Sequence, residues 1–558
     1  MNFFAEVKKC IEENVQQAIQ QAIADGALPQ ADPYSFTVEV PKDASLGDYA
    51  TNAAMMGAKV FRMPPQKIAQ IILEHLAKHE WLSDVTVAGA FINFRISPAY
   101  AKAVLSGILS EGSDYGRSNY GQGQRVLVEF VSANPTGPMH IGNARGGACG
   151  DCLASVFDYA GYQAFREFYV NDAGNQINKF GLSLSLRYRQ LYEDGIEMPE
   201  DSYHGEDIIQ HAKNFAALHG DQYMSVSEEE RQKALVAYAL PLNVEKIKND
   251  LEKYRIRYDQ WFMESQLHQN GEVEKTVARL VESGYTYESE GAIWFRATDF
   301  GCDKDFVLVR ANGVPTYVVP DIAYHYNKLV VRGFDKAIDV LGADHHGYVP
   351  RLKAALSALG VDVSKLDAVI VQMVRLVRDG EVIKASKRSG KAITLETLLD
   401  EIPTDAARFF FNLREPNSHF DFDLDLSVSK SNQNPVYYVQ YAHARICSIL
   451  EMLGRSAANA EEASAIAVES LNAQESALIK ILASFPEEII RSAQDYDVSR
   501  MTKYAVELAS AFHSFYNECR VKCEDEALMQ FRVCLICAVK QTIENVLTVL
   551  KVDAPEKM

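Results

Sequence analysis

The chain has 558 residues, and 47% of them are hydrophobic, which is ample for the globular cores of several domains. Nine cysteines in a chain of this length exclude a secreted scaffold held together by disulfides. The formal net charge is −19, and because phosphate neutralisation dominates nucleic-acid affinity, charge alone predicts no RNA partner. Net charge is a sum over the whole molecule, however, so folding can still segregate a basic face from acidic ones.

The N-terminal residues 1–23 alternate charged and apolar positions like an amphipathic helix, a pattern unlike that of a secretory signal. We find no apolar run that reaches the length of a membrane span. We therefore expect a cytoplasmic protein without a membrane partner. Residues 1–115 predict a small α+β domain, with helices flanking residues 35–40 and a strand at residues 88–96.

A phosphate-binding turn is predicted after residue 130. Residues 125–131 are β-branched and apolar, as in a buried parallel strand, and residues 143–159 have the small and apolar residues of a buried helix. The loop between them ends at a helix N-terminus, where free N–H groups and the helix dipole attract phosphate. His140 can donate to a phosphate oxygen, and Gly142 leaves room for one. A purely structural turn is the alternative for an isolated His-Gly pair.

Strands are less evident between residue 172 and about residue 291, where long charged and amphipathic segments predict a helical insertion. Strands resume at residues 292–295 and 306–309, and residues 316–319 are typical of a strand end. Asp321 follows that run, and Glu129 lies in an otherwise apolar strand. Because ligands gather at the carboxyl ends of strands in α/β folds, both acids can face one substrate cation.

Each acid has a structural alternative. Asp321 can be the N-cap of a helix at residues 322–329. Glu129 can form a buried salt bridge with an internal arginine. Tyr317, which lies nearby in sequence, can simply belong to the core.

A second candidate for phosphate binding is a basic stretch between the apolar run 369–377 and a helix expected to begin near Thr394. Lys384, Lys387, Arg388 and Lys391 fall within eight residues of one another, so the loop can bring ammonium groups to a polyphosphate. A solvated basic turn is the alternative.

The remaining chain predicts an all-helical C-terminal domain, because residues 437–453, 476–482 and 501–516 have helical spacing. Tyr437, Tyr438 and Tyr441 can stack on unpaired bases or form a half-buried core. Cys534 and Cys537 lie in apolar, helix-like sequence, as do Cys149 and Cys152, which favours core packing over a zinc site.

The turn at residues 140–143 and the basic stretch at residues 384–388 together resemble the two signatures of class I aminoacyl-tRNA synthetases, HIGH and KMSKS. The resemblance holds for their order and for the spacing between them. Asn143 replaces the last His of the first signature, and Ala385 and Arg388 replace the Met and the final Ser of the second. Longer matches resemble the arginyl-tRNA synthetase family in particular, from end to end: residues 128–145, 169–176, 317–323, 434–445 and 554–558.

This resemblance implies three domains: a tRNA-binding N-terminal domain at 1–115, a Rossmann-like catalytic domain at 116–425 with an insertion at about 175–290, and an anticodon-binding helical domain at 426–558. Residues 43–50 resemble this first domain, which touches the tRNA elbow in the family, and a structural turn that needs Gly47 is the alternative. Residues 405–408 resemble the motif for which the last domain is named. The implied reaction joins arginine to tRNA(Arg) through an arginyl-adenylate, with release of pyrophosphate and AMP, and generally needs bound tRNA even for activation. ATP with Mg²⁺ is the implied cofactor, no zinc is expected, and the protein is expected to be a monomer.

The resemblance also implies roles for individual residues. The catalytic residues are expected to be His140, Asn143, Lys384 and Lys387. The ATP site is expected to add Pro138, Gly142 and Ser386 to these four. The arginine site is expected to contain Glu129, Ser132, Asn134, Tyr317, Asp321 and His345, although family members often have Gln at position 345.

Other functions fit less well. A cysteine-specific synthetase should bind zinc through cysteines near its substrate, and none cluster suitably. A non-enzymatic tRNA-binding relative should have lost His140, Lys387 or Asp321, and all three are present. A P-loop ATPase requires a Gly-rich loop with Lys-Ser/Thr, which the sequence lacks.

Overall fold

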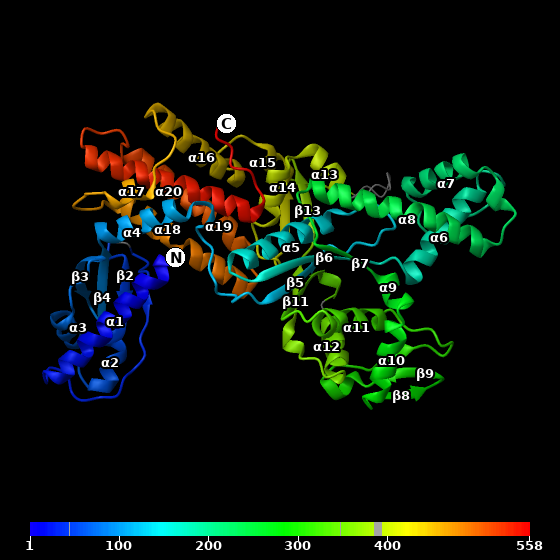
Figure 1. Ribbon diagram of the computed structural model, residues 1–558, viewed down its shortest axis with the longest axis horizontal. Coiled ribbons are helices and arrows are strands. Elements are labelled where there is room, and N and C mark those ends of the chain that lie inside the picture. Colours follow the sequence, from blue (N-terminus) through cyan, green and yellow to red (C-terminus); the bar gives the residue numbers. More distant parts are fainter. Residues whose placement is uncertain (44, 346, 384–392) are drawn as a thin grey trace. The chain divides into compact units, whose positions relative to one another are not determined.

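The computed structural model describes residues 1–43, 45–345, 347–383 and 393–558 (Figure 1). These residues form two compact units. The first unit contains Met1–Tyr120, Lys430–Asp495 and Arg500–Met558. The second unit contains Gly121–Ser429 and Tyr496–Ser499.

The N-terminal part of the first unit is an α+β module, as the sequence predicts. Four antiparallel strands form a sheet in the order β1-β2-β4-β3. Their bounds are β1 Val38–Glu39, β2 Tyr49–Thr51, β3 Leu82–Ala88 and β4 Phe91–Ile96. The strand expected at residues 88–96 is β4, and the turn before it contains Gly89 at a φ of +62°, a conformation that suits glycine.

The helices of this module are amphipathic. Their bounds are α1 Phe3–Ala24, α2 Ala53–Phe61 and α3 Pro65–His75. In α1, Val7, Ile11, Val15 and Ala18 are buried at a spacing of three or four residues, which places them on one face. This confirms the amphipathic helix expected of residues 1–23.

The C-terminal part of the first unit is helical, as expected. Its helices are α16 Pro435–Met452, α17 Ala460–Ser464, α18 Ala473–Asp495, α19 Ser499–Glu518 and α20 Glu526–Leu550. Residues 424–558 are all described, and they contain no strand. A helix from the other end of the chain, α4 (Pro98–Glu111), packs against α17, α18 and α20. Asn545 of α20 donates to the carbonyls of Gly112 (2.8 Å) and Tyr115 (2.9 Å), which joins the two ends of the chain in one unit.

By length and composition alone, α20 could cross a membrane, so the expectation that no segment is apolar and long enough is wrong for this helix. In the structure, 78% of its apolar window is buried, as in the core helix of a folded domain. Cys534 and Cys537 are buried in it. Burial raises the pKa of Cys534 to about 12 and that of Cys537 to about 11, so both thiols stay protonated near neutral pH and pack as apolar groups.

The second unit is built around a five-stranded sheet in which every neighbouring pair is parallel. The strands lie in the order β12-β11-β5-β6-β7. Their bounds are β5 Arg125–Phe130, β6 Gln163–Val170, β7 Gln260–Met263, β11 Lys336–Gly342 and β12 Leu366–Val371. This is the order of a doubly wound, Rossmann-like sheet, as predicted, and it changes direction between β5 and β11. Folds of this kind bind ligands at that point, outside the carboxyl ends of the strands.

The helix after β5 is α5, Ile141–Tyr159, which begins two residues before the expected start at residue 143. It packs closely on its own sheet because of its small residues. A Cβ added to Gly150 would lie 2.3 Å from the ring of Phe130 on β5, so glycine is needed for this approach.

The expected insertion begins as predicted, with helices α6 Gly174–Arg189, α7 Glu206–His219 and α8 Glu228–Lys253. They have a core of their own, in which Phe180, Leu184, Phe215 and Leu235 are buried. The span of about 175–290 is not entirely helical, however, because β7 and a further strand, β8 (Thr286–Ser289), fall inside it, and β7 completes the central sheet.

The chain between β7 and β12 adds a small antiparallel sheet and several helices. The elements are α9 Glu264–Gln269, α10 Glu272–Glu282, β8 Thr286–Ser289, β9 Ala292–Phe295, β10 Phe306–Val309, α11 Val318–Tyr326 and α12 Val349–Ala358. The strands expected at 292–295 and 306–309 are confirmed. The strand end expected at 316–319 is wrong, because Val318 opens α11. Pro320 lies in the first turn of that helix, where a missing N–H leaves no hydrogen bond unmade.

A third sheet and short helices complete the second unit. The elements are β13 Val374–Arg378, β14 Glu381–Val382, α13 Leu395–Glu401, α14 Thr404–Phe411, β15 Phe420–Asp423 and α15 Leu424–Val428. The helix expected near Thr394 is α13, and the Thr394 hydroxyl caps it by accepting from the N–H of Thr397 (3.2 Å).

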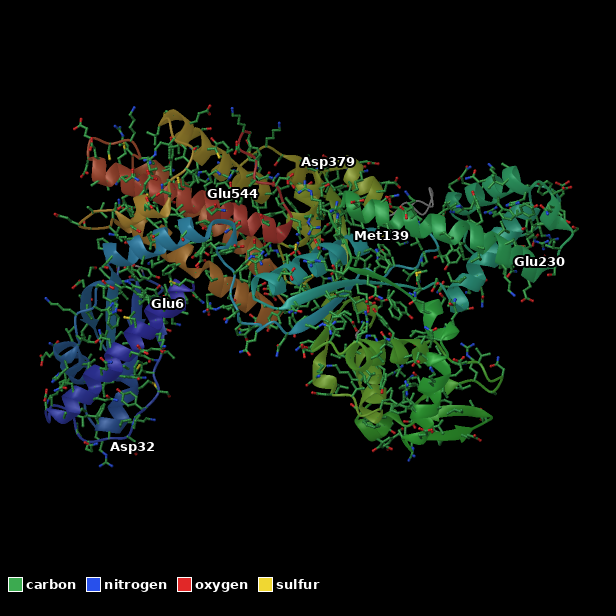
Figure 2. The ribbon with its side chains drawn as sticks, in the orientation of Figure 1. Glu6, Asp32, Met139, Glu230, Asp379 and Glu544 are labelled. Carbon is green, nitrogen blue, oxygen red and sulfur yellow. The ribbon has the colours of Figure 1, made fainter. Side chains whose placement is uncertain are left out.

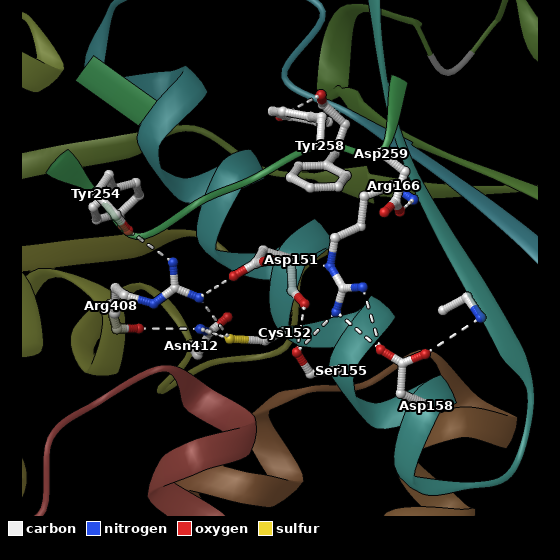
Figure 3. A network of polar contacts seen from close by, with 12 residues as sticks. Asp151, Cys152, Ser155, Asp158, Arg166, Tyr254, Tyr258, Asp259, Arg408 and Asn412 are labelled. Carbon is white, nitrogen blue, oxygen red and sulfur yellow. Dashed lines mark hydrogen bonds and ion pairs between the residues drawn. The ribbon is translucent and has the colours of Figure 1, made fainter. Parts of the chain in front are cut away.

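A buried polar network fixes α14 against α5 (Figure 3). The guanidinium of Arg408, fully buried, donates to Asp151 Oδ2 at 2.6 Å and to the carbonyl of Tyr254 at 2.9 Å. The other oxygen of Asp151 accepts from Arg166 Nε at 3.2 Å. Residues 405–408, which resemble the motif of the anticodon domain, therefore lie in the second unit, and Arg408 is part of its buried network.

Candidate active site

The loop from Val131 to His140 joins the carboxyl end of β5 to the N-terminus of α5; Met139, labelled in Figure 2, lies near its end. His140 is exposed and is the N-cap residue of α5. Its backbone N–H donates to Asn143 Oδ1 at 3.1 Å, so this side chain fixes the turn. Gly142 is exposed, and an added Cβ would meet no atom within 4 Å. Neither packing nor a positive φ therefore requires glycine at this position, which opens to solvent.

Directly after β5 the backbone adopts an unusual conformation. Val131 and Ser132 have φ angles of +70° and +39°, which L-residues other than glycine rarely adopt. The hydroxyl of Ser132 donates to Glu129 Oε1 at 2.8 Å and accepts from the N–H of Tyr169 at 3.1 Å. These bonds tie the turn to both neighbouring strands and orient the Glu129 carboxylate.

Glu129 pairs with a lysine, and the alternative that it pairs with an internal arginine is wrong. Lys328 lies in a π-helical turn, Asn327–Val331, that continues α11. Its ammonium donates to Glu129 Oε2 at 2.5 Å and to Asp339 Oδ1 of β11 at 2.9 Å, and its side chain is fully buried. Because β5 and β11 are adjacent, one cation can bridge their two acids.

Asp321 lies in the first turn of α11 and is not its N-cap, since the helix begins at Val318 and Tyr317 occupies the cap position. Its carboxylate is 3.1 Å from His325 Nδ1, one turn along the helix. His325 Nε2 is 2.8 Å from Asp339 Oδ2. The chain of contacts Asp321–His325–Asp339–Lys328–Glu129 thus joins both predicted arginine-binding acids in one cluster, which we call the acid cluster.

The charges in the acid cluster stabilise one another. Burial and Lys328 lower the pKa of His325, but Asp339 and Asp321 on its two ring nitrogens raise it to about 10, so the imidazole is charged at neutral pH. Burial opposes ionisation of Asp339, yet Lys328 and His325 bring its pKa well below the ordinary range. Burial likewise raises the pKa of Asp321, and His325 more than offsets it. Burial also raises the pKa of Glu129, and Lys328 limits the rise.

Tyr317 is not a core residue, because 75% of its surface is exposed. Its ring stacks on Tyr348, with centroids 6.0 Å apart. Asn134 and Pro138 are also exposed, on the loop after β5. These side chains are accessible to a ligand at the carboxyl edge of the sheet.

The basic loop with Lys384, Ser386, Lys387, Arg388 and Lys391 lies outside the described residues, as does the side chain of His345. The segment that follows the loop is described, and it lies against the His140 turn. The N–H of Ile141 donates to the carbonyl of Ile393 at 3.2 Å, and the N–H of Leu395 donates to Met139 at 3.0 Å. The described segment from Ile393 to Leu395 is therefore joined to the His140 turn, from which it is far apart in sequence.

Sequence reasoning missed Lys328, His325 and Asp339. Asp339 could have been noticed as an acid in an apolar strand, by the argument that was applied to Glu129. His325 and Lys328 follow Asp321 at helical spacing, four and seven residues on, which places the three on one helix face. No local pattern, however, indicates that this face meets Glu129.

Family models match almost the whole chain. A model for the arginyl-tRNA synthetase N-terminal domain matches residues 11–96, and a model for the catalytic domain of class I tRNA synthetases (R) matches residues 104–419. A model for the DALR anticodon-binding domain matches residues 439–558. Residues 405–408 lie outside this last match.

Full-length relatives agree with the models. Arginine–tRNA ligases from Acetivibrio thermocellus and Caldanaerobacter subterraneus are 51% and 52% identical to the chain, and each alignment covers 100% of both proteins. A solved Campylobacter jejuni structure assigned as an arginyl-tRNA synthetase has a TM-score of 0.75 at 34% identity, covering 83% of this chain and 100% of that one. The Thermus thermophilus arginyl-tRNA synthetase shares the fold, with a TM-score of 0.73 at 23% identity and coverage of 99% and 100%. The chain therefore belongs to the arginyl-tRNA synthetase family, the class I enzymes that use ATP to ligate arginine to tRNA(Arg).

Proposed function

We propose that the acid cluster is the pocket for the arginine side chain, with Glu129 and Asp321 as the acids that face the guanidinium. The main support for this proposal is that both acids belong to one hydrogen-bonded cluster. The cluster includes residues of β5 and β11, which lie on either side of the point where the strand order changes direction. Tyr317 and His345 complete the side-chain site, and Ser132 and Asn134 hold the amino acid end.

This pocket explains selectivity for arginine. A guanidinium is planar and forked, so it can satisfy two oxygens of each carboxylate in one plane. A lysine ammonium is a point charge and cannot meet two oxygens of each carboxylate in one plane, so it would make fewer hydrogen bonds in the pocket. The pocket should reject lysine for that reason.

ATP binds beside this pocket, at the N-terminus of α5. Its phosphates meet the open turn of Pro138, His140, Gly142 and Asn143, and the helix dipole favours their charge. Lys384, Ser386 and Lys387 reach them from the basic loop. The contacts of Ile141 and Leu395 with the segment that follows this loop support its approach to the same phosphates.

Mg²⁺ accompanies the nucleotide as its counterion. Among the described residues, one group has the spacing of metal ligands: Glu129, His325 and Asp339. Lys328 Nζ lies 2.5, 3.3 and 2.9 Å from these three side chains, so the group is already satisfied by an ammonium and does not fit a metal ion.

In the first step the arginine carboxylate attacks the α-phosphorus of ATP, which gives arginyl-adenylate and releases pyrophosphate. No protein nucleophile takes part. The protein contributes position and charge: the acid cluster orients arginine, while His140 and the lysines of the basic loop stabilise charge that develops on the leaving pyrophosphate. The activated carbonyl then passes to a terminal ribose hydroxyl of tRNA, and AMP leaves.

We assign tRNA contacts to all three domains: residues 1–115 bind tRNA, residues 116–425 form the catalytic domain, and residues 426–558 bind the anticodon. A groove of about 300 Å³ on the helical domain is lined by Tyr441, Arg445, Tyr516 and Met558, and the Arg445 guanidinium lies 4.1 Å from the Tyr516 ring centroid. Aromatic rings and a cation suit an unstacked base of the anticodon.

We further propose that the protein acts as a cytoplasmic monomer.

Pyrophosphate exchange with each amino acid, with and without tRNA(Arg), tests substrate and tRNA dependence together. We expect exchange with arginine alone among the amino acids, and only when tRNA is present. Exchange driven by lysine would contradict the proposed pocket, and exchange without tRNA would contradict the tRNA requirement.

Replacing His140 with alanine should slow arginine activation by roughly 100-fold and leave the Michaelis constant for arginine within about threefold, because one donor to a charged transition state is lost. Single-turnover formation of the adenylate is the measurement. His204→Ala, an exposed histidine of the insertion, is the control and should be neutral. If only the Michaelis constant for arginine changed, the assignment of His140 to the phosphate site would be wrong.

A further inference from the structure

Lys328 is the most enclosed cation of the acid cluster. Its side chain is fully buried, and its ammonium contacts Glu129 at 2.5 Å, Asp339 at 2.9 Å and His325 Nε2 at 3.3 Å. It also lies 4.1 Å from the ring centroid of Tyr324, within the range of a cation–π interaction. Four protein groups, those of Glu129, Asp339, His325 and Tyr324, therefore surround this ammonium.

Further charged groups face Lys328 from β6 and from the end of the π-helical turn. Glu167 of β6 is fully buried, accepts from Tyr324 at 2.6 Å and pairs with Arg332 at 2.5 Å. This acid therefore has its own cation, and the pair is neutral.

The remaining charges of the acid cluster do not cancel. Three carboxylates, those of Asp321, Glu129 and Asp339, are joined to two cations, Lys328 and His325. One negative charge is left over. Among the three acids Asp321 is the most exposed, with 27% of its side-chain surface accessible, against 12% for Glu129 and 7% for Asp339. The surplus charge thus lies on the side that a ligand can reach.

We propose that Lys328 is a positioning residue that sets the charge of the arginine pocket: it neutralises Asp339, holds Glu129 in place and ionised, and leaves one negative charge for one guanidinium. This inference rests on the arginine pocket proposed above. Lys328 does not touch substrate; it acts through Glu129.

The physical reason lies in burial. A carboxylate out of water tends to take up a proton, and a neighbouring carboxylate strengthens that tendency. Glu129 experiences both effects, from its own burial and from Asp339, and Lys328 is the strongest opposing influence on its pKa. Without Lys328, Glu129 would be protonated at a higher pH, and a protonated acid cannot accept both hydrogen bonds of a guanidinium.

The test is a Lys328→Met variant in the full-length enzyme with tRNA(Arg). Lys336→Met is the matched control, because Lys336 also pairs with an acid, Asp367 at 2.7 Å, but lies at the amino end of β11, away from the pocket. Pyrophosphate exchange at pH 6, 7, 8 and 9 gives separate Michaelis constants for arginine and ATP. A charge-balanced double variant, Lys328→Met with Asp339→Asn, removes one cation and one acid together.

We expect Lys328→Met to raise the arginine constant at least tenfold at pH 7, with the ATP constant within threefold. This increase in the arginine constant should become smaller as the pH rises, because Glu129 is ionised above its pKa and then binds the guanidinium. The double variant should recover most of the loss and should depend less on pH. The control should match the parent enzyme.

Equal increases in both constants, or a loss that does not change with pH, would reduce Lys328 to a structural role and overturn the inference. So would a double variant without recovery. If Lys328→Met fails to fold, the double variant decides: an arginine constant within fivefold of the parent supports the inference, and a larger loss overturns it. The pocket itself is tested separately by Glu129→Gln and Asp321→Asn. If neither of these weakens arginine use, the pocket assignment fails; if both do while Lys328→Met does not, only the role of Lys328 fails.

Discussion

An Asp321→Asn variant is expected to raise the Michaelis constant for arginine by about 30- to 300-fold. Removing one charge of a partly buried, hydrogen-bonded charge pair costs about 2–5 kcal/mol, and each 1.4 kcal/mol is a factor of ten. We take the lower part of that range because 27% of the Asp321 side chain is exposed to water. The Michaelis constant for ATP should stay within about threefold, since the nucleotide is assigned to the other side of the site, at the α5 N-terminus.

The measurement is pyrophosphate exchange with arginine or ATP varied in turn. Asp299→Asn is the matched control: this acid forms an exposed ion pair with Arg296 at 3.8 Å in the same unit and should be neutral. Comparable losses for arginine and ATP would argue that Asp321 supports the fold of the site as a whole and does not recognise the guanidinium.

The second large effect concerns stability. Replacing Arg408 with methionine should destabilise the second unit by about 3–5 kcal/mol, because it leaves the buried Asp151 with one cation in place of two. Arg408 and Asp151 have exposed side-chain fractions of 0% and 3%, so water cannot replace the lost partner. The carbonyl of Tyr254 loses its donor as well.

Urea unfolding followed by tryptophan fluorescence measures this effect, since Trp261 on β7 and Trp294 on β9 report on the second unit. Arg378→Met is the control, because Arg378 pairs with Glu401 on the surface, with exposed fractions of 45% and 52%, and should shift the midpoint little. If both variants unfold at the same urea concentration, the network in Figure 3 is not a main support of the fold.

Much of the fold follows from patterns that act within a few residues. The strand at 125–130, the helix after it, the amphipathic first helix and the helical C-terminal part all come from periodicity. This succeeds because a strand buried on both faces and a helix with one apolar face leave characteristic spacings in the sequence. The site residues around His140 were found in the same way, from a strand followed by a turn that contains glycine.

Errors occurred where a local pattern had two solutions. Residues 316–319 are β-branched and apolar enough for a strand, yet Val318 and Val319 open α11, since Pro320 fits the first turn of a helix and the turn is packed onto the core. Because α11 begins at Val318, Asp321 lies inside the helix, and the alternative that it is the N-cap is wrong. A strand inside the insertion, β7, was missed because it is only four residues long and its partner, β6, lies about 90 residues earlier.

The sequence by itself determined the family, the order of the domains and the two acids proposed to meet arginine, because motifs and periodicity are local properties of the chain. The tertiary structure alone decided what holds those acids. Lys328 reaches Glu129 across 199 residues of sequence, and it does so because β11 lies beside β5 and the π-helical turn that carries Lys328 packs against β11. Which buried charges become partners depends on that strand order and packing, and no spacing along the chain encodes it.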